Sequence, residues 1–402
     1  MQDFANTDTI LIMGLGHTGC RVLESIASLD GYNGIDMVAV DTDAGDLKAL
    51  EPKRIRTLLL GREAVGGHGT GGDYEQAKYI FMDSASEITR EVSGRSLLIL
   101  IAALGGGTGG AAEEVLKIAD ENMVPIVFLA VMPFAFEGNA RIQQAEELLS
   151  QMDNYCQVLV RVPNDKILMQ YTKNPASDAF GRAAEYLAKA AVCLATPYAC
   201  KRLLNASPSL LNSLSAHDGN PRCLLAHVSC GNSEDINNLT DTLTKQYVFE
   251  DSHLIENIDK GILILRIKGE CTEEELDFAI SQAKGLLPQA DVVPVAITDD
   301  QMSDYMALTL LLHPSQAAYS EEESLEPSEE GEAEAKEEGA FIEQERPVQR
   351  RGRRGASDRQ LQIPFEEEIL GIFAGDPENE WNGSNIDIPT FRRLKITIDK
   401  GT

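Results

Sequence analysis

Three glycine-rich segments carry the residues that could bind phosphate. The first, Gly14-Leu15-Gly16-His17-Thr18-Gly19, follows an apolar run and precedes a helical pattern. Glycines at such a turn let backbone amides approach a phosphate, and the dipole of the following helix favours negative charge. Asp41 ends the next apolar run, where a dinucleotide fold places the carboxylate that binds ribose. Taken alone, these two features are typical of an NAD site.

Two further glycine loops change that interpretation. Residues 66–72 read GGHGTGG and residues 105–110 read GGGTGG, and each loop precedes a helical pattern. Three such loops at one edge of a sheet would surround a polyphosphate with amides. A dinucleotide fold does not need the second and third loops. The sequence also lacks the G-x-x-x-x-G-K-[ST] pattern of the phosphate-loop ATPases.

The elements that must position these loops alternate between strand and helix over the first 135 residues. We expect strands at 9–14, 35–43, 96–107 and 124–134, with helices through 21–27 and 111–121. This alternation predicts a parallel sheet covered on both faces, with ligand-binding loops at the carboxyl ends of the strands.

The second half of the chain predicts a different organisation. Residues 177–204 have a long apolar helical pattern, in which Pro197 should introduce a kink or start a new segment. A smaller unit follows at 220–314, with strands expected at 223–230, 261–269, 291–298 and 305–312 and helices at 234–247 and 272–286. Glutamates dominate 321–345 and arginines dominate 346–355, so we expect this linker to be disordered.

Composition narrows the class of protein. A hydrophobic content of 43% over 402 residues supports a real core. The seven cysteines are scattered and never form C-x-x-C, which argues against zinc or a disulfide framework and favours a reducing cytoplasm. A net charge of -29 argues against nucleic-acid binding. We find no signal-peptide pattern at the start and no apolar run long enough to insert into a membrane.

Several motifs together resemble the tubulin/FtsZ family. The run AALGGGTGGAAEEV resembles the family signature G-G-G-T-G-[STA]-G, and MPFAFEGNAR is similar to K-P-F-x-F-E-G-x-x-R. VPNDKIL, DAFG and AVDTDAGDL resemble further family motifs, and the C-terminal DIPTFRR resembles the FtsZ peptide that docks on membrane tethers. The resemblance covers residues 8–313 and 386–393.

The resemblance implies the α/β tubulin/FtsZ fold. It implies a Rossmann-like GTPase domain at 8–176, a central helix and inter-subunit catalytic loop at 177–219, and a smaller α/β domain at 220–314. A disordered acidic linker would occupy 315–383 and a partner-binding peptide 384–402. Within that peptide the expected contacts come from Asp387, Ile388, Pro389, Phe391 and Arg393.

The resemblance also implies which residues bind nucleotide. GTP or GDP would be held with Mg²⁺ that is coordinated mainly by phosphates and water rather than by a dedicated protein metal site. Glu137 would accept from the ribose hydroxyls, Arg141 would lie across the nucleotide, and Phe180 would pack on the base. Thr108 would add a hydroxyl to the phosphates, which the three loops would hold through Gly14, Gly16, Gly19, Gly67, Gly69, Gly71, Gly105, Gly106, Gly107 and Gly109.

The sequence departs from the family at the base and at the catalytic loop. Arg21 and Asp41 stand where the family has nucleotide-contacting asparagines, and Ala184 stands where an asparagine or aspartate reads the base. In the catalytic loop Asn205 remains, but Ser207 and Leu210 occupy the two acid positions. Losing a general base typically costs about 10²–10⁴-fold in rate, so we expect slow hydrolysis.

The interpretation that follows is a cytoplasmic GTP-binding protein that polymerises head-to-tail at the division site. Its partners would be other copies of itself and membrane-tether division proteins that bind the C-terminal peptide. Two alternatives stay open. One is a slow or non-hydrolysing relative with a structural or regulatory role, and the other is an NAD-dependent oxidoreductase.

Overall fold

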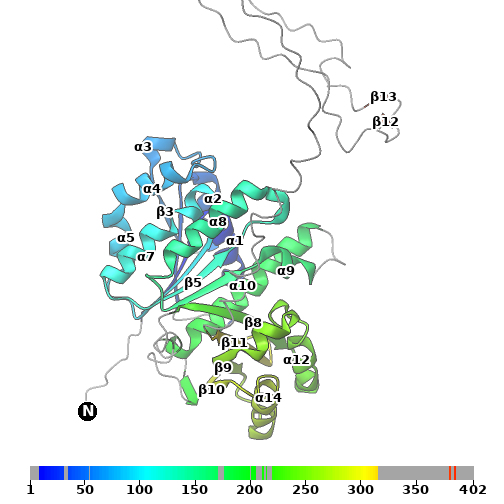
Figure 1. Cartoon of the computed structure of the whole chain (residues 1–402). Helices are drawn as coiled ribbons and strands as arrows, with labels where there is room; N and C mark the ends of the chain where they lie inside the picture. Colours follow the sequence, from blue (N-terminus) through cyan, green and yellow to red (C-terminus); the bar gives the residue numbers. More distant parts are fainter. Residues whose placement is uncertain are drawn as a thin grey trace, which may run out of the picture. The chain divides into compact units, whose positions relative to one another are not determined.

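A computed structural model describes most of the chain. The described residues are 9–30, 35–53, 55–170, 176–199, 201–204, 211, 214, 220–315, 380–381 and 384–385. The chain divides into two compact units, Met1–Gly331 and Glu332–Thr402. The first unit contains the expected strands and helices (Figure 1).

The N-terminal part of the sheet is parallel, as the alternating pattern predicted. Its strands lie in the order β3-β2-β1-β4-β5-β6, with bounds β1 Ile10–Leu15, β2 Ile35–Asp41, β3 Arg56–Leu59, β4 Leu97–Ala103, β5 Ile126–Val131 and β6 Val158–Val162. The expected strands at 9–14, 35–43, 96–107 and 124–134 are confirmed, the first shifted by one residue and the other three shorter than expected. Sequence reasoning did not single out β3 and β6, which have four and five residues.

Both faces of this sheet are buried, and successive side chains of a strand enter different cores. In β4, Leu98 and Leu100 face one cluster, whereas Ile99 and Ile101 face the other. Helices α4 Tyr74–Asp83, α5 Ala85–Val92, α7 Ala112–Glu121 and α8 Asn139–Met152 cover the first face. Helices α1 Gly16–Ala27 and α10 Ala176–Ala199 cover the second (Figure 1). Shorter helices are α2 Ala44–Lys48, α3 Arg62–Val65, α6 Gly107–Gly110 and α9 Asn164–Met169.

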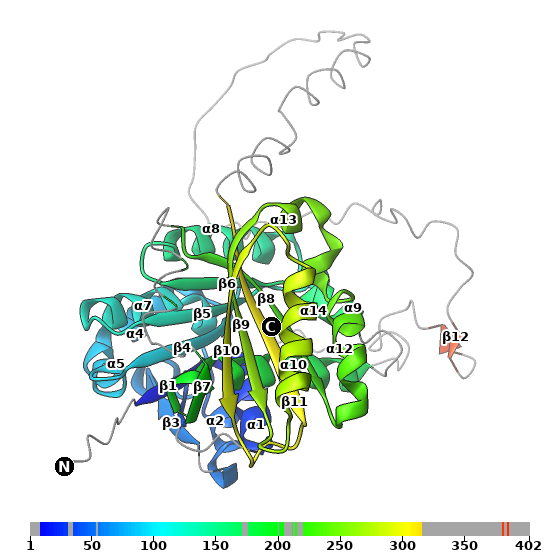
Figure 2. The ribbon, with the colours of Figure 1, turned by 90° about the horizontal axis from the view of Figure 1, so that it is seen from below.

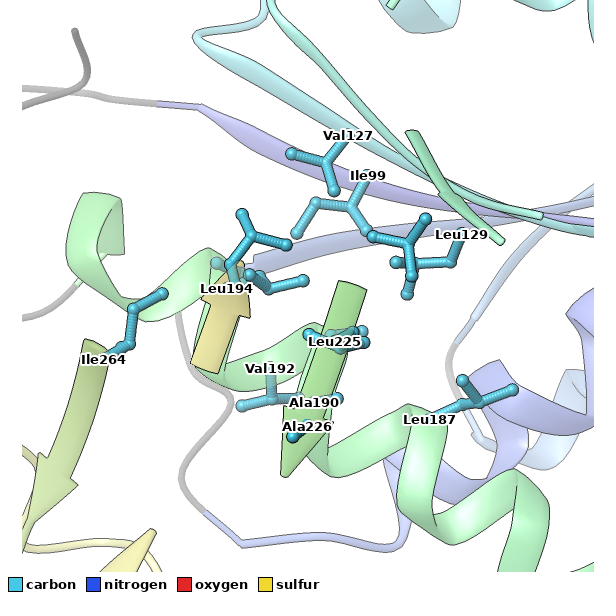
Figure 3. Close-up of a cluster of buried hydrophobic side chains, with 14 of the residues drawn as sticks. Ile99, Val127, Leu129, Leu187, Ala190, Val192, Leu194, Leu225, Ala226 and Ile264 are labelled. Atoms are coloured by element: carbon cyan, nitrogen blue, oxygen red, sulfur yellow. The ribbon is translucent and has the colours of Figure 1, made fainter. Parts of the chain in front are cut away.

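Helix α10 joins the N-terminal strands to the second half of the sheet. Its apolar side chains lie between β4 and β5 on one side and the later strands on the other (Figure 3). Leu187, Ala190 and Leu194 are all buried. Because α10 contributes to one continuous core with both halves, the two halves pack as a single body within the first unit.

The predicted helix over 177–204 is wrong at its end. Helix α10 continues through Pro197 and stops at Ala199, and Lys201–Leu204 instead forms β7, antiparallel to β10. Proline has no N–H to bond the carbonyl four residues earlier, but the Thr196 hydroxyl donates to the Cys193 carbonyl at 2.9 Å. That bond replaces the missing one, and the chain then gains ladder bonds by pairing with the edge of the sheet.

The second half of the sheet is mixed. Strands continue in the order β6-β8-β11-β9-β10-β7, with β8 Arg222–Cys230, β9 Ile258–Ile267, β10 Asp291–Thr298 and β11 Met306–Pro314. Strands β6 and β8 pair over only Leu159↔Arg222 and Val160↔Cys223, and β11 is antiparallel to both neighbours. Figure 2 shows these strands from below with the helices α12 Ile236–Leu243, α13 Ser252–Glu256 and α14 Glu273–Gly285. The strands and helices expected at 220–314 are confirmed.

The second unit is described only at a short hairpin, in which β12 Glu380–Trp381 pairs with β13 Ser384–Asn385. The predicted linker at 315–383 and the predicted peptide contacts at Asp387, Ile388, Pro389, Phe391 and Arg393 otherwise lie outside the described residues. Among the helices that the structure describes, none combines the length and apolarity needed to cross a bilayer.

Candidate functional site

The carboxyl ends of four parallel strands meet at one edge of the sheet. Leu15 of β1 is in register with Val40 of β2 and Ala102 of β4, and Ala103 of β4 is in register with Val131 of β5. The loops after these strands surround an open cavity of about 450 Å³, together with the loop at 66–72, which follows β3 and α3. The three glycine loops predicted from the sequence therefore do converge on one place.

The glycines of these loops fall into two groups. Gly16, Gly69, Gly71, Gly106, Gly107 and Gly109 line the cavity. Gly14 and Gly19 lie behind it and touch each other, since a Cβ on Gly14 would lie 2.6 Å from the Gly19 carbonyl oxygen. This contact brings the start of α1 against the end of β1. Gly67 and Gly105, at φ 77° and 83°, shape the turns and are also not among the described lining residues.

Thr108 and Asp41 form a buried hydrogen-bonded group at the floor of the cavity. The Asp41 Oδ1 atom accepts from the Thr42 amide at 2.7 Å, the Asp43 amide at 3.2 Å and the Thr108 hydroxyl at 3.1 Å. The hydroxyl oxygens of Thr42 and Thr108 lie 2.9 Å apart. Burial raises the pKa of the Asp41 carboxyl, and the two amides and the Thr108 hydroxyl partly offset that rise. In this arrangement the Thr108 proton is directed at Asp41, not at the open cavity.

Glu137 and Arg141 lie together on the opposite wall. Glu137 Oε1 accepts from the Phe134 amide at 2.9 Å, and its Oε2 accepts from Arg141 at 2.6 Å. The Arg141 side chain is 46% exposed, so it can turn toward a ligand without unfolding its surroundings. Both residues line the cavity, as their predicted contacts with ribose and nucleotide require.

A second cavity of about 380 Å³ adjoins the first and shares His17, Thr18, Phe134 and Asn164 with it. Phe180 lines this second cavity and meets Phe134 edge to face, with ring centroids 5.2 Å apart. The remaining described residues that line it are Arg21, Val22, Ala183, Ala184 and Leu187, and no carboxylate is among them. An apolar slot with aromatic walls beside a glycine-lined cavity has the shape and chemistry to hold a base next to phosphates.

Sequence reasoning missed several lining residues. His17 of α1 and Asp46 of α2 pair through Nδ1 and Oδ1 at 3.0 Å. Asp43 caps α2 by accepting from the Gly45 amide, and Thr70 lies beside Gly107. Asp43 and Asp46 belong to AVDTDAGDL, and Asn164 belongs to VPNDKIL, so the motifs themselves held the signal. Their side chains could be assigned to the cavity only once the loops were brought together.

The predicted catalytic loop lies outside the described residues, so Asn205, Ser207 and Leu210 stay predictions. Within the described part of the chain no group of three or more His, Cys, Asp or Glu side chains could hold a metal ion.

Comparison with known proteins agrees with the fold. Residues 9–172 match the model of the Tubulin/FtsZ family, GTPase domain. The cell division protein FtsZ of Helicobacter pylori J99 is 32% identical over 169 residues, which is 42% of this chain and 43% of that protein. FtsZ 1 of Pyrococcus furiosus is 33% identical over 182 residues, 45% and 48% of the two chains. The chain thus matches less than half the length of these relatives.

Solved structures share the fold over a larger part of the chain. An empty FtsZ dimer from M. jannaschii superposes with a TM-score of 0.66 at 21% identity, covering 77% of this chain and 89% of that one. CetZ2 from Haloferax volcanii, solved as a GTPgS-bound protofilament, superposes with a TM-score of 0.62 at 20% identity and covers 81% and 99%. The similarity of fold includes the second half of the sheet, which the family model does not reach.

Proposed function

Because the chain is a divergent member of the FtsZ family of tubulin homologues, we propose that it binds guanine nucleotide with Mg²⁺ and polymerises head-to-tail. The observation that carries this proposal is the convergence of three glycine loops on one cavity that continues into an aromatic slot. A nucleoside triphosphate has the matching parts, with phosphates for the amides and a base for the slot. In the proposed filament this nucleotide lies between consecutive subunits.

The residues of the cavity fit this ligand. Helix α1 begins at Gly16 and directs its first amides at the cavity edge. Gly106 has open space around its Cβ position, so a phosphate could approach its backbone closely. Glu137 would bind the ribose hydroxyls and Phe180 would stack on the base. When bound, Mg²⁺ would neutralise phosphate charge, and its protein contact would come from a carboxylate at the cavity floor.

We further propose that the filaments serve cell division in the cytoplasm, tethered at midcell through the DIPTFRR peptide. The relatives named as cell division proteins support this role. Self-association is supported by neighbours solved as a dimer and as a protofilament. A slow or non-hydrolysing filament is the second candidate, and the observation that favours it is the replacement of both loop acids by Ser207 and Leu210.

Identification of the bound nucleotide tests the ligand class. Purified protein should release GDP or GTP on denaturation, and Gly106→Trp should abolish binding by filling the cavity. The matched control is Gly285→Trp, which adds the same side chain where no atom lies within 4 Å of the new Cβ. Gly106 is preferred to Gly107, whose Cβ would collide with Thr70. Release of NAD(H) without guanine nucleotide would instead favour the oxidoreductase alternative.

A further inference from the structure

The phosphate end of the site is acidic. Asp41, Asp43, Asp46 and Glu137 line the glycine-bounded cavity. Among the described lining residues, Arg141 is the one with a permanent positive charge, and it is already paired with Glu137. Backbone amides and a helix dipole attract phosphate. They must do so here against several carboxylates in a partly enclosed space, where charges interact more strongly than in water.

Asp41 contributes the least solvated of these carboxylates. Its side chain is 3% exposed, and Oδ1 has three hydrogen-bond donors. Its Oδ2 atom is buried and has no partner among the described residues, although the side chain lines the cavity. A buried acceptor without a donor is costly, by roughly 1–3 kcal/mol. Such an atom at a binding site points to a ligand that supplies the missing positive or donor group.

A phosphate oxygen cannot supply that group because it is itself an acceptor. Asp46 accepts from His17, and Asp43 caps α2 through Oδ1 and is only partly buried, so that water can reach the rest of its carboxylate. Mg²⁺ in nucleotide sites is usually bound by one or two carboxylates together with phosphates and water. Among the described residues that line the cavity, Asp41 has the carboxylate oxygen that is both buried and without a partner, and it can meet that requirement.

We propose that Asp41 is the protein ligand of the divalent cation that accompanies the nucleotide, and that it makes triphosphate binding depend on this cation. The proposal rests on the nucleotide binding proposed above. Without the cation, Asp41 repels the phosphates; with it, the same carboxylate joins the cation to the protein. Asp41 therefore lowers the affinity for GTP when the cation is absent and raises it when the cation is bound.

The test compares GTP affinity by calorimetry in Mg²⁺ and in EDTA for the full chain and Asp41→Asn. Asparagine keeps an oxygen that can accept the three hydrogen bonds but removes the charge. Wild-type affinity for GTP should fall at least about tenfold without Mg²⁺, because the Asp41 charge then faces the phosphates in a partly enclosed site. In Asp41→Asn that loss should shrink several-fold, and in EDTA the variant should bind GTP more tightly than the wild type.

Asp43→Asn is the matched control, because it removes a charge from the same cavity and asparagine still caps a helix well. It should leave the dependence on Mg²⁺ close to that of the wild type. A second readout is Mn²⁺ bound to the GDP complex, counted by electron paramagnetic resonance, which should weaken in Asp41→Asn alone.

Two results would overturn the assignment: an equal loss on Mg²⁺ removal in the wild type and in Asp41→Asn, or the same change in Asp43→Asn. A wild-type protein that binds no guanine nucleotide even with Mg²⁺ would overturn the proposed function itself. The two failures are therefore distinguishable. Thermal melting of both variants checks that the fold is retained.

Discussion

The base slot predicts weak selection for guanine. Guanine carries donors at N1 and at its 2-amino group, and both need acceptors when they leave water. The described residues that line the slot include no carboxylate, and Asn164 supplies the amide oxygen. Glu185 follows Ala184 in sequence but pairs with Lys189 at 3.5 Å and does not line the slot. We therefore expect inosine triphosphate, which lacks the 2-amino group, to bind within about fivefold of GTP, since unmade solvent-accessible hydrogen bonds cost ~1 kcal/mol or less.

Replacing Ala184 by aspartate should create guanine selectivity. Ala184 is half-buried on α10 and lines the slot, so a carboxylate there can reach a bound base edge. A hydrogen bond to a charged group contributes about 1.5–3 kcal/mol. Phe180 is 38% exposed, which shows that the slot is partly open to water. We therefore take the low end, and expect Ala184→Asp to favour GTP over inosine triphosphate by about tenfold.

Competition calorimetry with GTP, ITP and ATP measures these ratios directly. Ala184→Leu is the matched control, because it adds similar bulk without an acceptor and should leave the GTP to ITP ratio unchanged. A wild-type preference for GTP above tenfold would refute the reasoning, since it would require an acceptor outside the described slot. A selective gain in Ala184→Leu would refute it too, because shape alone would then account for the change.

Three further predictions concern turnover, recruitment and stability. Ser207→Asp with Leu210→Asp should raise phosphate release at least about tenfold by restoring a general base, and no gain despite intact filaments would show that the loop is misplaced. Deleting 384–402 should leave polymerisation in light scattering unchanged but abolish midcell fluorescence, and normal midcell rings would contradict the tether role. Burial lowers the pKa of His227 to about 3, so the unfolded chain binds a proton that the folded protein does not. Unfolding free energy should therefore fall as pH drops from about 6.5 toward 3, by up to about 1.4 kcal/mol per pH unit. His227→Gln should flatten this slope in urea titrations, whereas replacing the exposed His253 should not.

Much of the fold could be predicted because its strands are long, apolar and buried on both faces. Leu97–Ala103 is a continuous apolar run, and no amphipathic alternative competes with a central parallel strand. Short edge segments gave no such signal. Arg56–Leu59 has only four residues with two exposed, and Lys201–Leu204 continues a helical pattern until the sheet edge offers it a partner. Tertiary pairing decided the structure of these segments, and local sequence could not reveal it.

The parts of the site that are made of backbone amides could be predicted from the sequence. The contacts between side chains were harder to predict. Glycine-rich loops can be recognised from composition alone, and the cavity lies where the three loops come together. The pairing of His17 with Asp46 joins the first turns of α1 and α2, whose approach depends on the register of β1 and β2. The three donors on Asp41 likewise come from its own turn and from the GGGTGG loop. Only the folded arrangement of these loops determines which oxygen of Asp41 is left without a partner.

The sequence differs from the family pattern at side chains that would contact the nucleotide, whereas the three glycine-rich loops are retained. Asp41 lines the glycine-bounded cavity proposed for the phosphates, and Ala184 lines the slot proposed for the base. Backbone amides and helix dipoles bind phosphate whatever the base, so that part of recognition survives both replacements. Loss of the base acceptor removes discrimination among purines, and gain of Asp41 adds a requirement for a cation. Recognition in this protein should therefore rest on the metal-bound polyphosphate more than on guanine.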